Sequence, residues 1–157
     1  MTAPLNSSEL GAWRTFLLAH ATVVRRLEAE LVLEHDLALA SYDVLVQLSE
    51  APDQRLRMTE LADRVLLSRS GLTRLVDRLE RDGLIAREAC PSDARGTLAV
   101  LTEAGLIRLR AAWPTHLRGV VEHVTSRLSP LEVEQLATIL GRLVDHTPLP
   151  AARLDGR

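Results

Sequence analysis

The sequence contains no lysine, so arginine supplies all 19 of its basic side chains. It holds a single cysteine, Cys90, which excludes an intramolecular disulfide. Only 3% of the residues are aromatic although 46% are hydrophobic, so a core must consist mainly of leucine, valine, alanine and isoleucine. This composition favours packed helices over a large sheet. Any contact with an anion must use a guanidinium, which bonds phosphates and guanine edges bidentately.

Signals for export and membrane insertion are also missing. The first residues lack the basic region and apolar run of a signal peptide, and no apolar stretch approaches the roughly 18 residues that span a bilayer. Together with the single cysteine, this predicts a cytoplasmic protein with no membrane partner. A length of 157 residues favours one domain, and the net charge of -2 gives no global signal for a polyanionic partner.

The chain lacks the motifs of enzymes and metal sites. It has no nucleophile elbow, phosphate loop or telling pair of carboxylates, so we expect neither enzymatic activity nor a cofactor. His116 and His123 are seven residues apart, which separates them by about 10 Å along a helix and prevents them from sharing one metal ion. Without a cluster of cysteine and histidine, we expect no metal site.

Hydrophobic periodicity and capping residues predict a mainly helical chain with one β-hairpin. A break is expected at Ala51-Pro52-Asp53. The predicted elements are a helix from Asn6 or Ser7, a helix over 42–48 capped by Ser41, a short helix from Thr59 to about Leu66, a helix from Ser68 to Asp82-Gly83, strands 84–89 and 97–101 around a tip at Pro91–Gly96, a helix from Thr102 toward Leu128 that Pro114 kinks or interrupts, and a helix from Ser129 to about Val144.

The helix after Ser68 has two distinct faces. Its apolar residues follow the spacing i, i+3, i+4, i+7 and form one stripe that must face the core. At about 100° per residue, the opposite face is polar and rich in arginine. Hydroxyls near its start and arginines along its length suit a helix in the DNA major groove. The stripe is Leu72, Leu75, Val76 and Leu79, and the opposite face is Ser70, Arg74, Asp77, Arg78 and Arg81, with Thr73 at its edge and Arg69 in the first turn.

Exposed arginines on an amphipathic helix are, taken alone, more typical of a solvated face. The neighbouring elements favour DNA binding. A short helix, a tight connection and a second helix make a helix-turn-helix, and a hairpin with Asp93 and Arg95 at its tip follows at once. Such a hairpin can reach the flanking minor groove. The segment 64–95 has seven arginines and five acids, so it carries +2 while the remainder carries -4.

Five stretches of the chain resemble the MarR family of bacterial transcriptional regulators. The recognition helix, the Asp-x-Arg of the wing and the following Leu-Thr-x-x-Gly form a specific combination, and the likeness covers nearly the whole chain. The stretches are Leu61-Ala62, Leu66–Glu80, Gly83-Leu84-Ile85, Pro91–Gly96 and Leu101–Gly105.

The resemblance implies a winged helix-turn-helix domain with N- and C-terminal dimerisation helices, in a mainly α fold with a small β-hairpin wing. We therefore assign 1–157 to a single domain, 41–101 to the DNA-binding lobe, and 6–35 and 102–146 to the dimerisation helices. It also implies that Arg95 enters the minor groove with Asp93 orienting nearby arginines. Ala94 stands where many members carry a second arginine, which weakens the wing. The residues that the resemblance places in or beside the major groove are Ser68, Arg69, Ser70, Thr73, Arg74 and Arg78.

The terminal helices predict a homodimer independently of the family. Their apolar faces are too broad for the small winged unit to cover, and a two-fold partner would cover them while presenting two recognition helices to a palindrome. These faces include Leu106, Leu109, Trp113, Leu117, Val120, Val124, Leu136, Ile139, Leu140 and Leu143.

Two further groups of residues each allow a functional and a simpler explanation. A small aromatic or phenolic effector suits a mixture of aromatic and polar groups on the helices that the family uses to frame a cavity. The tryptophans fit a dimer core equally well. Cys90 fits a packed small side chain better than an oxidant sensor. The candidate effector residues are Trp13, Arg14, His20, Tyr42, Asp43, Trp113, His116 and Arg118.

These observations predict a homodimeric repressor that binds double-stranded DNA and is released by a small molecule. Recognition helices one turn apart would read a palindrome of roughly 16 to 20 base pairs. An enzyme and a winged helix that binds protein instead of DNA are the alternatives. The low net charge favours the protein-binding alternative, and a steep salt dependence of a DNA complex would argue against it.

Overall fold

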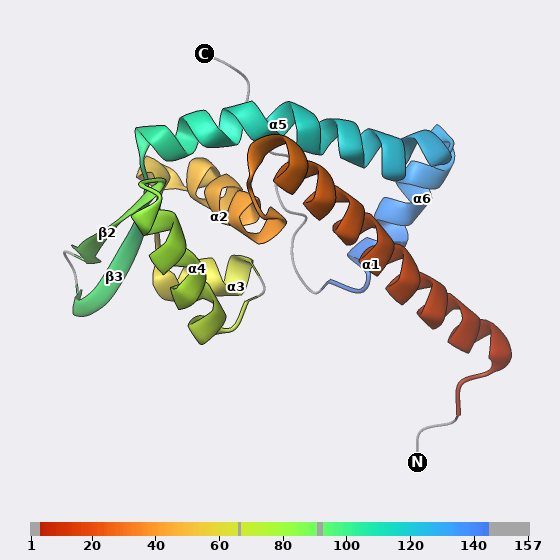
Figure 1. The fold of residues 1–157 in the computed structure, drawn as a ribbon. Helices are drawn as coiled ribbons and strands as arrows, with labels where there is room; N and C mark the ends of the chain where they lie inside the picture. The colour runs from red at the N-terminus through yellow and green to blue at the C-terminus, as the bar shows by residue number, and fades with distance from the viewer. Residues whose placement is uncertain (1–3, 66, 91–92, 145–157) are drawn as a thin grey trace.

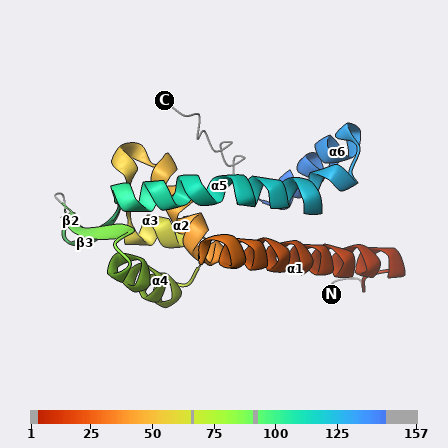
Figure 2. The same cartoon turned by 45° about the horizontal axis from the view of Figure 1, so that its top comes forward.

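The structure of the chain is mainly helical with one small antiparallel sheet (Figure 1). The computed structural model describes residues 4–65, 67–90 and 93–144, and only the backbone of 93–95. Two long helices, α1 (Ser7–His35) and α5 (Glu103–His123), lie side by side along most of the molecule (Figure 2). The winged unit hangs from one end of this pair, and α6 (Pro130–Gly141) lies at the other.

The winged unit follows the predicted order of elements. It contains α2 (Leu39–Glu50), α3 (Met58–Arg64) and α4 (Arg69–Arg81), followed by β2 (Ile85–Cys90) and β3 (Asp93–Leu101). The sheet also has a third strand that the sequence did not predict. This strand, β1 (Arg55–Arg57), pairs with β3 and completes the order β1-β3-β2. At three residues it is too short for a periodic signal.

Local capping signals explain several helix ends. Asn6 caps α1 and Glu9 bonds back to its backbone, which forms a capping box. The Thr102 hydroxyl accepts the Gly105 N–H at 3.0 Å and starts α5. Ser129 makes a capping box at the start of α6. These starts confirm the predictions from sequence.

The start of α2 was predicted wrongly. Ser41 does not cap this helix, because the helix begins at Leu39 and Ser41 is buried inside it. The free N–H of Leu39 donates to the Glu28 carboxylate of α1. A residue eleven positions away thus supplies the cap, and a local pattern does not contain that information.

Several other boundaries differ from the predictions. The short helix starts at Met58, so Thr59 lies within it. The returning strand starts at Asp93, well before the predicted Thr97. Residues 91–92 of the predicted tip lie outside the described part of the chain. The long helix ends at His123, and a 3-10 turn over Thr125–Arg127 follows. The last helix ends at Gly141 and stops short of Val144.

Pro114 does not interrupt α5, which runs unbroken from Glu103 to His123. A proline inside a helix removes the bond to the carbonyl four residues earlier. That residue is Arg110, and both Pro114 and Arg110 are exposed. Water can therefore replace the lost bond, so the helix tolerates the proline.

The core lies inside the winged unit and where this unit meets α1 and α5. It is almost entirely aliphatic, as the composition predicts, and tyrosine is its one aromatic residue at less than 2% exposure among the described residues. The most buried large side chains are Tyr42, Leu31, Leu45, Leu48, Leu61, Leu72, Leu79, Ile85 and Leu109. No helix in the described ranges is long and apolar enough to cross a membrane.

A seam of polar contacts joins α1 to α5. The Thr115 hydroxyl donates to Glu34 at 2.9 Å and lies 2.8 Å from His35 Nε2. Further along, His123 Nε2 lies 2.5 Å from Glu30 Oε1. Gly119 makes room for this pairing, since a Cβ there would lie 2.5 Å from Glu30 Oε2. The seam fixes the rotation of α1 about α5.

Candidate nucleic-acid interface

Helix α4 (Arg69–Arg81) is the most amphipathic element of the winged unit. Ser68 caps it by accepting the Gly71 N–H at 3.1 Å. Gly83 follows its end with a φ of +73°, a conformation that favours glycine. The stripe of Leu72, Leu75, Val76 and Leu79 is buried, each at 6% exposure or less. Cap, stripe and stop all confirm the prediction.

The polar face of α4 is exposed. Thr73 donates its hydroxyl to the Arg69 carbonyl at 2.8 Å, and the Ser68 and Ser70 hydroxyls lie 3.3 Å apart. The arginines Arg74 and Arg78 have no ion-pair partner among the described residues. The structure therefore places six residues with a predicted DNA contact on α4 and its N-cap, and all six are exposed: Ser68, Arg69, Ser70, Thr73, Arg74 and Arg78.

Arg87 of β2 joins the recognition helix to the wing. Its guanidinium lies 2.6 Å from Asp77 Oδ1 and 2.6 Å from Glu80 Oε2, and it donates to the Thr73 carbonyl at 3.4 Å. Burial lowers the pKa of Arg87, but its hydrogen bonds and attraction to Asp77 and Glu80 outweigh burial and raise it. Arg87 thus neutralises two acids that would otherwise repel phosphate.

Nothing in the sequence marks Arg87 as part of this interface. It is one of several charged residues in a short strand, and its partners lie ten and seven positions earlier on a different element. The contact exists because β2 packs beside α4 after the turn at Gly83. Only the orientation of these two elements shows it.

The wing is a hairpin of β2 and β3 with an irregular end. Ile85 pairs with Leu101, and the register shifts between Ala89 and Cys90, where Cys90 pairs with Asp93. Cys90 is buried at 7% exposure. The side chains of Asp93 and Arg95 lie outside the described part of the chain, so their DNA contacts stay predictions.

The predicted effector residues fall into two groups within one protomer. Trp13 and His20 line an apolar groove between α1 and α6. Tyr42 and His116 lie elsewhere, between α2 and α5, with ring centroids 4.5 Å apart. Trp113 packs partly buried against the core, whereas Arg14 and Asp43 are exposed. One chain alone does not unite the two groups.

The second group contains titratable side chains with altered pKa values. Burial raises the pKa of Tyr42, aided by the charges of Asp43 and Glu50, and burial lowers the pKa of His116. Asp43 reaches the surface, yet partial desolvation of its carboxyl, and then the charge of Glu28, raise its pKa to about 6. The Tyr42 hydroxyl and His116 Nδ1 are buried without a partner among the described residues.

One cluster of possible metal ligands appears that the sequence did not indicate. Glu30, Glu122 and His123 bring one ligand atom each within 4.8 Å of one another. Arg26 lies 3.5 Å from His123 Nδ1, and its positive charge disfavours a cation there. The His123–Glu30 contact already serves the seam between α1 and α5.

Known proteins share the sequence pattern of this chain. Residues 35–96 match the model of the MarR family. The chain is 36% identical to the HTH-type transcriptional regulator MhqR of Bacillus subtilis over 110 residues, covering 70% of this chain and 74% of MhqR. It is 32% identical over 120 residues to the HTH-type transcriptional repressor YetL of the same organism, covering 71% and 72%.

Solved structures agree with these relatives. Sco3205, a MarR family transcriptional regulator from Streptomyces coelicolor solved in complex with DNA, is 37% identical to this chain. It superposes with a TM-score of 0.85 over 89% of this chain and 91% of its own. The match extends beyond the winged unit to most of the helical frame.

Proposed function

The chain belongs to the MarR family of transcriptional regulators, which bind DNA rather than catalyse reactions, and from this premise we propose a homodimeric repressor that a small molecule releases from a palindromic operator. The observation that carries the proposal is α4, with a fully buried apolar stripe and an exposed face of hydroxyls and arginines. A similar regulator, Sco3205, has been solved with DNA.

The two ends of α4 have different proposed tasks. Ser70, Thr73 and Arg74 lie in its first half, which in a helix-turn-helix meets base edges. Arg69 and Arg78 lie at the borders of this set and are assigned to phosphates. Arg95 is assigned to the minor groove. The ion pairs of Arg87 support this arrangement, because they remove two negative charges beside the phosphate path.

Dimerisation is proposed through the terminal helices α1, α5 and α6. Leu109 of α5 was predicted on the free apolar face, but it is fully buried in the core of one protomer. The outer faces of α1 and α6 leave large apolar side chains in solvent, and the groove between these two helices is lined almost entirely by apolar atoms. A second copy would cover these residues and bring two α4 helices to one face of DNA. The exposed residues include Trp13 at 52%, Phe16 at 41%, Ile139 at 56% and Leu143 at 69%.

Dimerisation would also bear on the effector residues. We propose that Trp13, Arg14 and His20 of one protomer meet Tyr42, Asp43, Trp113 and His116 of the partner copy. The predicted aromatic site would then form only in the dimer. The repressor assignment draws support from YetL, which is named a repressor.

Operator selection tests the proposal directly. Rounds of selection from random duplex DNA should enrich a palindrome of roughly 16 to 20 base pairs. Arg74→Ala should weaken binding to it by about tenfold or more, equivalent to the 1–3 kcal/mol of a base contact. Arg110→Ala, an exposed arginine on α5 away from the interface, is the matched control. Failure to enrich any sequence, or equal binding by Arg74→Ala, would overturn it.

A further inference from the structure

Asp77 lies on the side of α4 that faces away from the core. Ser70, Thr73 and Arg74 are the proposed base contacts of this helix, and Asp77 occupies the next position of the spacing i, i+3, i+4, i+7. At about 100° per residue, Ser70, Arg74 and Asp77 lie within about 60° of one another around the helix axis. Homeodomain recognition helices read the major groove with four residues at the same spacing. Asp77 therefore lies where a helix in the major groove meets base edges.

A carboxylate alone at this position would be repelled by the DNA phosphates, but Arg87 of β2 offsets its charge. Arg87 Nη2 lies 2.6 Å from Asp77 Oδ1, and Arg87 Nη1 lies 2.6 Å from Glu80 Oε2. Within the described part of the chain, the second oxygen of Asp77, Oδ2, accepts no hydrogen bond. The Asp77 side chain is also 51% exposed. Asp77 is thus held by one oxygen and can offer the other to DNA.

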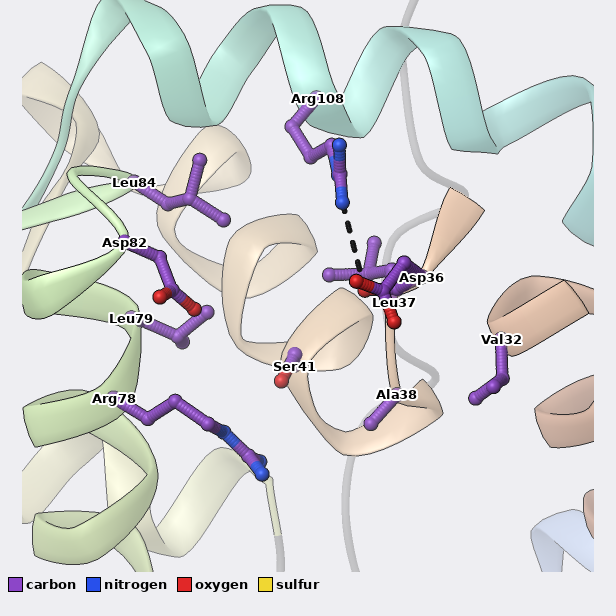
Figure 3. Close-up of a pocket in the computed structure, with 10 residues that line it drawn as sticks. All are labelled: Val32, Asp36, Leu37, Ala38, Ser41, Arg78, Leu79, Asp82, Leu84 and Arg108. Carbon is purple, nitrogen blue, oxygen red and sulfur yellow. Dashed lines mark hydrogen bonds between the residues drawn. The ribbon is translucent and has the colours of Figure 1, made fainter. Parts of the chain in front are cut away.

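Asp82 is a second acid at the end of α4, and it lies on another side of the helix. Together with Arg78 it borders a cavity of about 530 Å³, whose lining includes Arg108 of α5 (Figure 3). Asp82 forms no ion pair with any residue that the structure describes. It lies about 140° around the helix axis from Asp77. Of these two acids, only Asp77 lies on the side that would face bases, and Asp82 can serve as its control.

The free oxygen of Asp77 is a hydrogen-bond acceptor, and this limits the bases that it can contact. In the major groove, guanine presents two acceptors, and thymine presents one acceptor and a methyl group. Adenine presents an amino donor beside the acceptor N7, which would repel a carboxylate. Cytosine presents only the donor N4 amino group. Cytosine is therefore the base whose edge suits Asp77.

We propose that Asp77 determines part of the operator sequence by accepting a hydrogen bond from the N4 amino group of a cytosine in each half-site. Arg87 holds Oδ1 and leaves Oδ2 to the base, so Arg87 is the positioning residue for this contact. Because the ion pair fixes the side chain before DNA binds, less rotamer freedom is lost on binding. This inference rests on the proposed function, since it names a base that the recognition helix reads.

Selection from random duplex DNA, followed by affinity measurements on the intact protein with every base at each half-site position, tests the contact. At one position in each half-site, wild type should favour cytosine over each other base by about fivefold or more. Asp77→Ala should reduce this preference to less than about twofold and keep the preferences at the other positions. Asp77→Asn should shift the preference toward adenine, because an asparagine amide can bond both N6 and N7 of adenine.

A base analogue isolates the proposed bond from the rest of the interface. The base 2-pyrimidinone is cytosine without its 4-amino group. At the selected position it should weaken wild-type binding by about fivefold or more, relative to the change that it causes in Asp77→Ala. Asp82→Asn is the matched control, because it removes one exposed acid from the end of the same helix. It should change the affinity for all sequences by a similar factor through charge and keep the cytosine preference.

Three results would overturn the inference. They are wild-type base preferences retained at every position by Asp77→Ala, an equal loss of the cytosine preference in Asp82→Asn, and equal weakening of wild type and Asp77→Ala by the analogue. Thermal unfolding shows whether each variant is folded, and Asp77→Asn, which keeps the shape of the side chain, gives an independent result if Asp77→Ala is not. If wild type enriches a palindrome but the Asp77 variants read it as wild type does, only this inference fails. If wild type enriches no sequence, the proposed function fails.

Discussion

The two flanks of the recognition helix differ in how they are held. On the wing side, Arg87 reaches from β2 to Asp77 and Glu80 at 2.6 Å each. On the opposite side, Arg78 and Asp82 border a cavity and form no ion pair among the described residues. One flank of α4 is therefore fixed by ion pairs to β2, and the other borders a cavity.

The two flanks place α4 between a wing that holds it by ion pairs and a cavity. Wing and helix are joined by charged contacts, so they would approach DNA as one unit. The cavity lies between that unit and the frame of α1, α2 and α5. Substitutions at four positions test this difference between the two flanks.

The largest effect is expected from Leu79→Ala, which tests whether the side of α4 that borders the cavity is packed as core. Leu79 is 1% exposed although it borders the cavity. Its loss should lower the free energy of unfolding by about 2–5 kcal/mol. Leu72→Ala, at 1% exposure on the same stripe but away from the cavity, should cost a similar amount. Urea denaturation at matched protein concentration measures both, and a loss below about 1 kcal/mol for Leu79→Ala alone would mean that this flank is loose surface.

Gly105→Ala should have the next largest effect, because it presses on the wall of the cavity. A Cβ at this position would lie 2.1 Å from the Leu84 carbonyl oxygen, which is backbone and cannot rotate away. The expected loss of unfolding free energy is about 1–3 kcal/mol. Gly11→Ala is the control, since a Cβ there meets nothing within 4 Å. Equal stability of the two variants would show that the backbone at Leu84 shifts readily to admit the added methyl group.

Arg87→Ala removes the ion pairs that hold α4 to β2 on the wing side. Its side chain is 25% exposed, so losing two ion pairs should cost only about 1 kcal/mol of unfolding free energy. Operator affinity should fall by about tenfold, because Asp77 and Glu80 regain uncompensated charge beside the phosphates. A double-mutant cycle with Asp77→Ala isolates the coupling. If Arg87→Ala bound DNA like wild type, the ion pairs between α4 and β2 would have no part in DNA recognition.

The smallest effect on stability is expected from Arg78→Gln, on the side of α4 that borders the cavity. Because Arg78 has no ion-pair partner in the described ranges, the unfolding free energy should change by less than about 0.5 kcal/mol. Operator binding should weaken, and the slope of log affinity against log salt should fall by about 1, as expected when one phosphate contact is removed. A salt slope identical to that of wild type would exclude Arg78 from the DNA interface.

Much of the helical pattern could be predicted because its causes are local. The stripe from Leu72 to Leu79 follows from helical spacing, and Ser68, Thr102 and Ser129 are caps whose partners lie three residues away. The start of α2 could not be found this way, because Glu28 of another helix caps it. The strand β1 was also missed, since only its pairing with β3 defines it.

The candidate site divides in the same manner. Sequence alone determined that α4 is amphipathic, where it begins and ends, and that its outer face is rich in arginine. Tertiary structure decided that Arg87 neutralises Asp77 and Glu80, that Trp13 and Tyr42 lie apart in one protomer, and that Arg108 enters a cavity beside α4. The physical reason is range. Helical periodicity and caps depend on neighbours three or four residues away, whereas ion pairs between elements and cavities depend on how whole helices and strands pack.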